Sequence, residues 1–246
     1  MELPWADLGQ KMGRLDQSER QALIRRSFLF KDVPQPILER LATLSVTKHL
    51  DRRETLFNRG DEGDALYAVV EGLVRIWVGS DSGKELTFSI MEPGDVFGEI
   101  ALLDGLPRTA NATAQEATVL LVMQRSAFLS VLENEPTLGR HIIELLCERM
   151  RLKTDLLSDF AFADLPVRLA RKLCDLVMAH GEIDGNQARL GKKFSQTEFA
   201  QMLGVSREAI NKQLSAWSHK GWVSTEEGGL RILNMNNLRA VAGAHG

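Results

Sequence analysis

Apolar residues recur along this chain with spacings that change from one stretch to the next. Near the N-terminus they repeat every three or four residues, which predicts helices over residues 15–30 and 34–44. Between about residues 46 and 128 they instead form short segments separated by turns that contain Gly and Asp. The clearest segments are residues 66–70, 74–78, 86–90 and 118–122. Several short strands with regular turns favour an antiparallel jelly-roll or barrel.

A long helix is predicted from Pro136, which suits a first helical turn because it lacks an N–H, to about Phe160. Two neighbouring stripes, mostly apolar, run along it. They are Leu138, Ile142, Leu145, Arg149, Leu152 and Leu156, and Ile143, Leu146, Met150, Lys153 and Leu157. A face this wide needs cover on two sides, so we expect one side to pack on the chain's own β-domain and the other to pair with a second copy. The alternative is a buried helix in a monomer, and the pattern does not show which stripe is the dimer seam.

Capping residues then mark the limits of further helices. Asp164 and Pro166 predict the start of a helix that ends near Gly181. Residues 181–193 are polar and contain Gly, which predicts a loop or a short linker. The Ser-Gln-Thr-Glu sequence of residues 195–198 has the form of a capping box, so another helix begins there.

Residues 194–223 have the pattern of a helix, a turn and a second helix. The expected core positions are Phe199, Met202, Leu203, Val205, Ile210, Leu214 and Trp217. Gly204 allows a positive φ in the turn, and Ser206 caps the second helix. Residues 222–225 and 230–233 predict a hairpin, the wing of a winged helix-turn-helix.

The outward face near the start of the second helix is polar. It carries Arg207, Glu208, Asn211 and Lys212. Side chains at this place in a helix-turn-helix reach base edges in the major groove. An arginine can pair with guanine and a glutamate can accept from cytosine, each giving about 1–3 kcal/mol of discrimination. The alternative is a helical hairpin with a solvated polar face.

Residues 97–110, Phe-Gly-Glu-Ile-Ala-Leu-Leu-Asp-Gly-Leu-Pro-Arg-Thr-Ala, carry the densest candidate chemistry. Gly98 permits close approach of the backbone, and the turn after it would direct helix N-terminal amides at an anion. Arg108 can hold a phosphate by two parallel hydrogen bonds, with the Thr109 hydroxyl beside it. Glu99 suits a ribose 2′-hydroxyl because a carboxylate only accepts. The alternative is a plain turn with a structural ion pair between Glu99 and Arg108.

This stretch resembles the phosphate-binding cassette of cyclic-nucleotide-binding domains at nearly every position, and Gly60, Gly72 and Gly94 stand at strand turns where that family has glycines. Alignment of residues 160–162 with the cyclic AMP receptor protein family implies further ligand contacts from the long helix. The implied ligand residues are Gly98, Glu99, Ile100, Ala101, Arg108, Thr109, Ala110, Arg149, Lys153 and Thr154. Lys153 departs from the family's pattern of adjacent Thr and Ser, so cAMP, cGMP or both are implied, with cAMP slightly favoured.

The C-terminal region is similar to the winged helix of the cyclic AMP receptor/FNR family, since Ser206-Arg207-Glu208 matches the start of its recognition helix. The implied DNA-contacting residues are Ser195, Thr197, Ser206, Arg207, Glu208, Asn211 and Lys212. The resemblance also implies a homodimer on palindromic double-stranded DNA, a TGTGA-like half-site, and RNA polymerase as a partner. Lys212 replaces a second arginine of the best-known member, and lysine is a point donor rather than a fork.

Composition and charge agree with this assignment. The 246 residues carry a net charge of −3. Residues 163–246 hold 11 Lys and Arg against 8 Asp and Glu, giving +3, so the rest carries −6 (19 − 25), which fits a DNA-facing C-terminal domain. No apolar run approaches the ~18 residues of a membrane span, and the first residues lack the form of a secretory signal. Cys147 and Cys174, expected to be buried free thiols, suit a reducing compartment, so we expect a cytoplasmic protein without membrane contact.

An enzyme such as a nucleotide phosphodiesterase is the rival class. The five His residues are scattered singly and no nucleophile motif stands out, so we expect neither catalysis nor a metal. A second alternative is a DNA-binding regulator of the same family that responds to another signal, such as redox state, haem or a small molecule. Its nucleotide pocket would then be vestigial. The two isolated cysteines do not supply an iron–sulfur site for it.

Together these patterns predict an α+β fold in three parts. The parts are an antiparallel β-roll that binds a cyclic nucleotide with N-terminal helices (1–135), a long dimerisation helix and hinge (136–162), and a winged helix-turn-helix (163–246). The expected function is a transcription regulator whose DNA binding is promoted when the ligand shifts the population of the dimer's two states.

Overall fold

The computed structural model describes residues 16–30, 33–81, 83–191, 194–226 and 229–243. The chain divides into two compact units, residues 1–78 with 88–148 and residues 79–87 with 149–246. The long helix α5, Pro136–Phe162, contributes residues to both units. Helices and antiparallel strands give the predicted α+β class. The division into three parts at residues 135 and 162 stays a prediction.

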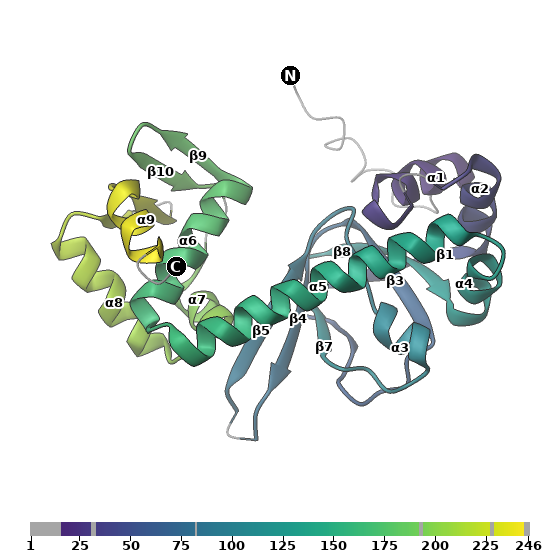
Figure 1. Ribbon diagram of the computed structural model, residues 1–246, viewed down its shortest axis with the longest axis horizontal. Helices are drawn as coiled ribbons and strands as arrows, with labels where there is room; N and C mark the ends of the chain where they lie inside the picture. The colour runs from purple at the N-terminus through teal and green to yellow at the C-terminus, as the bar shows by residue number, and fades with distance from the viewer. Residues whose placement is uncertain (1–15, 31–32, 82, 192–193, 227–228, 244–246) are drawn as a thin grey trace. The chain divides into compact units, whose positions relative to one another are not determined.

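Two four-stranded sheets form the β-roll (Figure 1), with strand orders β1-β8-β3-β6 and β2-β7-β4-β5. The strands are β1 Ser45–Leu50, β2 Thr55–Phe57, β3 Ala65–Glu71, β4 Val74–Gly79, β5 Glu85–Met91, β6 Val96–Phe97, β7 Asn111–Ala114 and β8 Thr118–Gln124. The pairs β1–β8, β3–β8, β3–β6, β2–β7 and β4–β7 all run antiparallel. The predicted antiparallel roll is confirmed, and so are the four strands predicted from their apolar segments.

Alternation along β3 shows how the first unit builds two cores. Ala65, Tyr67 and Val69 point between the two sheets, into a cluster shared with β7 and β8. Leu66, between them in sequence, points to the other face and joins the core that the helices cover. Because both faces of this strand are buried, its sequence is a nearly continuous apolar run.

Short helices cover the second of these cores. They are α1 Gln17–Arg26, α2 Gln35–Leu44, α3 Glu99–Asp104 and α4 Arg125–Leu132, with a short 3₁₀ turn at Phe28–Phe30. The predicted helix over 15–30 is wrong beyond Arg26, because Ser27 is extended with φ −74° and ψ 138° and its N–H closes the helix on Ile24. Residue 15 lies outside the described residues.

Along α5 the side chains separate into a buried and an exposed set. Leu138 and Ile142 are 0% and 6% exposed in the core of the first unit. Ile143, Met150 and Leu157 are 63%, 64% and 69% exposed. Cys147 is exposed as well, so the expectation of a buried thiol is wrong there, because this side of the helix meets no part of the first unit's core. Although α5 has 27 residues, no helix in the described chain is long and apolar enough to cross a bilayer.

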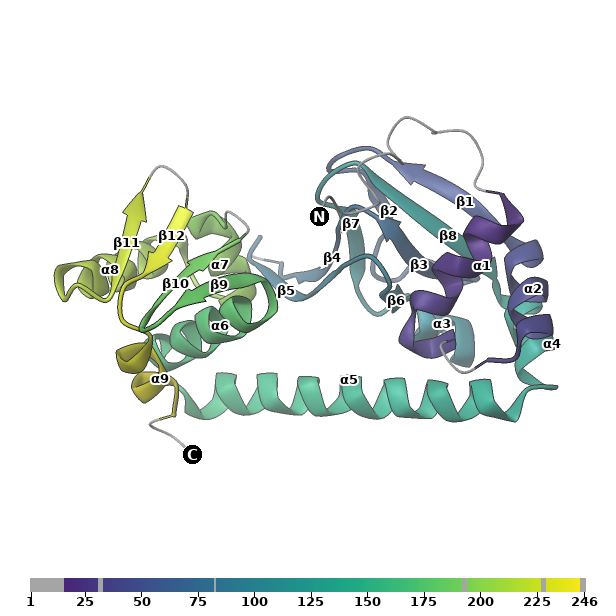
Figure 2. The same ribbon diagram turned by 90° about the horizontal axis from the view of Figure 1, so that it is seen from above.

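The second unit has its own sheet, with the order β11-β12-β10-β9 (Figure 2), and its own core. Its elements are α6 Leu165–His180, β9 Gly181–Asp184, β10 Gln187–Leu190, α7 Gln196–Leu203, α8 Arg207–His219, β11 Val223–Glu226, β12 Gly229–Ile232 and α9 Met235–Gly243. Asp164 occupies the N-cap of α6 as predicted, but its side chain makes no capping hydrogen bond. Cys174 in α6 is half-buried, and burial raises the pKa of its thiol.

One sequence prediction fails in this unit. Residues 181–190 form the hairpin β9–β10 rather than a loop, with the turn at Gly185, φ +57°. Only Ala188 and Leu190 of β10 are buried, and Ala188 pairs with Ile232 of the distant strand β12. Two apolar positions are too few for a local strand pattern, so the strand depends on its tertiary partner. Residues 192–193 of the predicted loop lie outside the described residues.

Candidate functional site

Arg108 is the centre of the nucleotide-binding candidate in the first unit, and it is only 4% exposed. Its Nη1 donates to the carbonyl oxygen of Gly98 across 3.0 Å and its Nη2 to that of Ala65 across 2.9 Å. Its backbone is held as well, since its N–H donates to Asp61 and its carbonyl accepts from Gly60, each across 2.8 Å. The side chain is therefore fixed by neutral carbonyls, not by the Glu99 ion pair of the alternative interpretation.

The guanidinium of Arg108 keeps unused donor capacity. Its Nε–H is buried and finds no acceptor among the described residues. Its central carbon lies 4.4 Å from the ring centroid of Phe57 and 5.4 Å from that of Tyr67, so aromatic faces stabilise the cation. A buried cation held by carbonyls and rings, with a free donor, is suited to receive an anion.

Gly98 sets the backbone geometry beside this arginine. It is the N-cap of α3, in the left-handed region with φ +85°, and no side chain caps the helix there. A Cβ atom at Gly98 would lie 2.8 Å from Nη1 of Arg108. Only glycine therefore allows both the turn and the close approach.

The other cassette residues predicted as ligands surround these two. Glu99 is 3% exposed and Ala101 2%, Ile100 is half-buried, Ala110 is 7% exposed and Thr109 is exposed. The structure thus places all seven predicted residues of the cassette around α3 and the segment that follows it.

The remaining three residues of the predicted ligand set are on the long helix α5. Arg149, Lys153 and Thr154 lie on the part of α5 that belongs to the second unit. Thr154 donates its hydroxyl to the carbonyl oxygen of Met150 across 2.9 Å, and Lys153 is exposed. Their role at the nucleotide stays a prediction.

Sequence reasoning missed two residues of the cassette's surroundings. A Cβ atom at Gly63 would come within 2.1 Å of the Ala101 side chain and 3.3 Å of Nε of Arg108, so Gly63 lets α3 pack closely. Tyr67 stacks on Phe97 with centroids 5.3 Å apart, and burial raises the pKa of its hydroxyl, although Arg108 opposes that shift. Gly63 lies outside the predicted strand segments and Tyr67 lies within one of them, residues 66–70, so neither stood out as part of the site.

The second unit contains the predicted helix-turn-helix, α7 and α8. Ser195 and Glu198 form the predicted capping box, with distances of 3.2 Å from Glu198 N to the Ser195 hydroxyl and 2.7 Å from Ser195 N to the Glu198 carboxylate. Gly204 closes α7 with φ +62°, and the Ser206 hydroxyl accepts from the N–H of Ala209 across 3.2 Å. These local signals were predicted correctly.

All seven residues predicted to contact DNA are exposed. Hydrogen bonds from its own backbone and from the Ser206 hydroxyl hold the pKa of the Glu208 carboxyl below its ordinary value, so Glu208 is a ready acceptor. The carbonyl of the Asn211 side chain accepts from Gln196 of α7 and from Ser215, each across 3.5 Å. Sequence reasoning missed Gln196, because only the tertiary contact between α7 and α8 reveals it.

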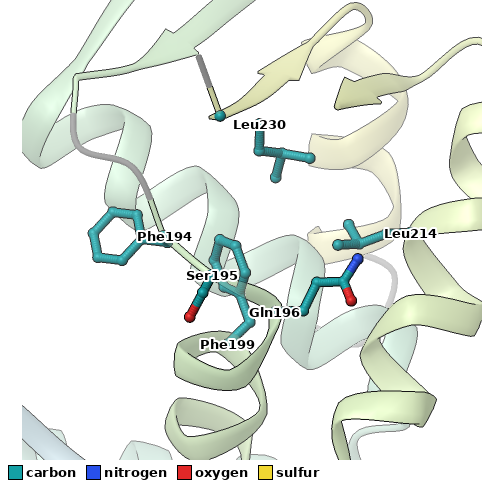
Figure 3. Close-up of a pocket in the computed structure, with 7 residues that line it drawn as sticks. Phe194, Ser195, Gln196, Phe199, Leu214 and Leu230 are labelled. Atoms are coloured by element: carbon teal, nitrogen blue, oxygen red, sulfur yellow. The ribbon is translucent and has the colours of Figure 1, made fainter. Parts of the chain in front are cut away.

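A cavity of about 220 Å³ lies in the second unit near the start of α7 (Figure 3). It is lined by Phe194, Ser195, Gln196, Phe199, Leu214, Gly229 and Leu230. None of these side chains is charged, so this cavity does not suit a cyclic phosphate. The described chain also brings together no group of three His, Cys, Asp or Glu residues that could hold a metal ion.

Family comparisons match both parts of the chain. Residues 47–135 match the model of the cyclic nucleotide-binding domain, and residues 167–241 match that of the Crp-like helix-turn-helix domain. The chain is 31% identical over 216 residues to the CRP-like cAMP-activated global transcriptional regulator of Mycobacterium tuberculosis, covering 88% of this chain and 96% of that relative. It is 33% identical over 192 residues to the cyclic AMP receptor protein of Thermus thermophilus, covering 76% and 83%.

Solved structures give the same assignment. The catabolite activator protein of Thermus thermophilus is 27% identical, with a TM-score of 0.52, and the match covers 89% of this chain and 100% of that one. The c-di-GMP-responsive regulator CLP of Xanthomonas campestris has the same fold at 24% identity, with a TM-score of 0.70 over 82% and 99% of the two chains. By these matches and by its cassette and helix-turn-helix, the chain belongs to the CRP family of cyclic-nucleotide-binding, DNA-binding transcription regulators.

Proposed function

We propose that the protein is a cytoplasmic homodimer that binds cAMP through Arg108 and its cassette, and that cAMP promotes binding to palindromic promoter sites. The observation that carries the proposal is the buried guanidinium of Arg108, whose Nε–H has no acceptor among the described residues. A cyclic phosphate would supply that acceptor and neutralise the cation in one contact. Gly98 leaves the room that this guanidinium occupies, since a Cβ atom there would lie 2.8 Å from Nη1 of Arg108.

The choice of cAMP rests on relatives. The Mycobacterium tuberculosis and Thermus thermophilus proteins carry cAMP in their names and match over most of their length. We also propose that Arg149, Lys153 and Thr154 contact the base. Lys153 could meet a purine carbonyl, which keeps cGMP as the second ligand to be measured.

Isothermal titration calorimetry of the full chain with cAMP and with cGMP tests the proposal. The wild-type protein is expected to bind cAMP more tightly than cGMP. Arg108→Ala is expected to lose at least about a hundredfold in affinity, because a charged hydrogen-bonded pair is removed. Arg52→Ala, an exposed arginine in the turn after β1, is the matched control and should bind like wild type. Equal affinity in wild type and Arg108→Ala would refute the site.

The proposal of DNA binding is based on a set of exposed residues of the helix-turn-helix. They are Arg207, Glu208, Asn211 and Lys212 at the start of α8, together with Ser195, Thr197 and Ser206. We propose that this face enters the major groove at a TGTGA-like half-site, and that the promoter-bound dimer contacts RNA polymerase. Binding-site selection from random duplexes, with and without cAMP, tests this. Selection of one palindrome only in the presence of cAMP is the expected result, and cAMP-independent selection would point to a regulator with another signal.

A further inference from the structure

A second arginine of the first unit, Arg125, links the cassette to the helix that follows the β-roll. It is the first residue of α4 and is half-buried. Its Nε donates to the carbonyl oxygen of Leu102 in α3 across 2.7 Å, and its backbone N–H donates to the carbonyl oxygen of Asp64 across 2.7 Å. One residue therefore connects α3, the start of α4 and the segment just before β3.

The helix that Arg125 holds is too short to be stable alone. α3 has six residues, and its last carbonyl groups need partners outside the helix. Gly105 supplies one contact, since its N–H donates to Ala101 across 3.0 Å. Arg125 supplies the contact to Leu102, and its Nη2 would lie 3.4 Å from a Cβ atom at Gly105. A cation along the C-terminal end of a helix also meets the favourable end of the helix dipole.

The side chain of Leu102 adds an apolar connection between α3 and the core of the first unit. Leu102 is 0% exposed and belongs to the core that contains Phe128 of α4 and Leu138 and Ile142 of α5. Its carbonyl accepts from Arg125, and its side chain belongs to the core that α4 and α5 share. A displacement of α3 therefore acts on α4 through two contacts of one residue.

We propose that Arg125 is a positioning residue of the nucleotide site: it holds α3 in the place that the cassette needs and connects movements of α3 to α4. The proposal rests on the proposed function, because it takes the cassette of Arg108 as the site of cyclic-nucleotide binding. Arg125 itself does not touch the nucleotide. Its effect comes from fixing the Leu102 carbonyl, and with it the backbone that begins at Gly98.

The test compares Arg125→Met, which keeps the length of the side chain and removes the donors, with Arg125→Lys, whose ammonium can reach the same carbonyl. Arg52→Met, in an exposed turn, is the matched control. Hydrogen exchange of the full chain without nucleotide is expected to be about tenfold faster over residues 99–105 in Arg125→Met and unchanged in β3 and β8. Calorimetry is expected to show cAMP binding about tenfold weaker in Arg125→Met, restored to within about threefold in Arg125→Lys.

Unchanged exchange over residues 99–105 in Arg125→Met would overturn the proposal. Equal acceleration in α3, β3 and β8 would overturn it as well, since Arg125 would then stabilise the whole unit rather than α3. Failure of wild type to bind either cAMP or cGMP would contradict the proposed function instead. The exchange comparison is made without nucleotide, so it decides in that case too whether Arg125 holds α3.

Discussion

A Cβ atom on Gly98 would lie 2.8 Å from Nη1 of Arg108, so the guanidinium occupies the space that any other side chain at residue 98 would need. The arginine cannot move away freely, because its two terminal nitrogens are bound to the carbonyl groups of Gly98 and Ala65. The positive φ of Gly98 adds a second requirement for glycine.

Gly98→Ala is therefore expected to lower the free energy of unfolding by about 1–3 kcal/mol and to weaken cyclic-nucleotide binding more than tenfold. Denaturant unfolding and calorimetry measure the two effects. Gly83→Ala is the control, since Gly83 has φ +76° and nothing within 4 Å of its Cβ position. It shares the backbone strain, so nucleotide binding as weak in Gly83→Ala as in Gly98→Ala would contradict the role of the contact with Arg108.

Tyr67 is the one tyrosine of the chain, so its ionisation can be followed directly by the ultraviolet absorbance of the phenolate. Burial raises the pKa of its hydroxyl in the folded state, which means that the unfolded chain loses this proton first. The resulting stabilisation is complete below about pH 10 and decreases as the pH rises from there toward the folded pKa.

We expect the phenolate to appear at higher pH in the folded protein than in the protein unfolded by denaturant. Tyr67→Phe should flatten the decrease of unfolding free energy above about pH 10. Identical titration curves for folded and unfolded protein would show that burial does not act on this hydroxyl.

Met150 lies in the middle of the exposed stripe of α5, with Ile143 and Leu157 one heptad away on each side. If this stripe is the dimer seam, Met150→Lys should weaken dimerisation about a hundredfold. Each dimer contains two copies of the substituted position. Each copy would lose the roughly 1.5 kcal/mol that burial of a Met side chain contributes.

Analytical ultracentrifugation of the full chain measures the dissociation constant. Glu148→Lys places the same side chain on the same helix away from this stripe and is expected to leave the dimer intact. A Met150→Lys protein that dimerises as tightly as wild type would show that another face forms the seam.

Arg207 is exposed at the first position of α8. Arg207→Ala is expected to lose about 10–100-fold in affinity for the selected site and much less for random DNA at low salt, because phosphate contacts survive the substitution. Fluorescence anisotropy with both duplexes measures the ratio. Equal losses on the two duplexes would assign Arg207 to the phosphate backbone instead of a base.

Several parts of the fold could be predicted because their causes are local. The capping box of Ser195 and Glu198 and the glycine turn at Gly204 each depend on a few neighbouring residues, and the structure contains both. The hairpin β9–β10 could not be predicted, because Ala188 needs Ile232, far along the chain, to complete its sheet. The exposure of Cys147 could not be predicted either, since it depends on which side of α5 faces the core.

The sequence by itself determined the order of the β-roll, the long helix and the helix-turn-helix, the cassette with Gly98 and Arg108, and the polar face of α8, since these follow from residue types and short-range spacing. Only the tertiary structure decided what surrounds the arginine. The carbonyl groups of Gly98 and Ala65, the ring of Phe57 and the contact space left by Gly63 come from segments far apart in the chain. The burial of a charge depends on everything that encloses it, and no local pattern contains that information.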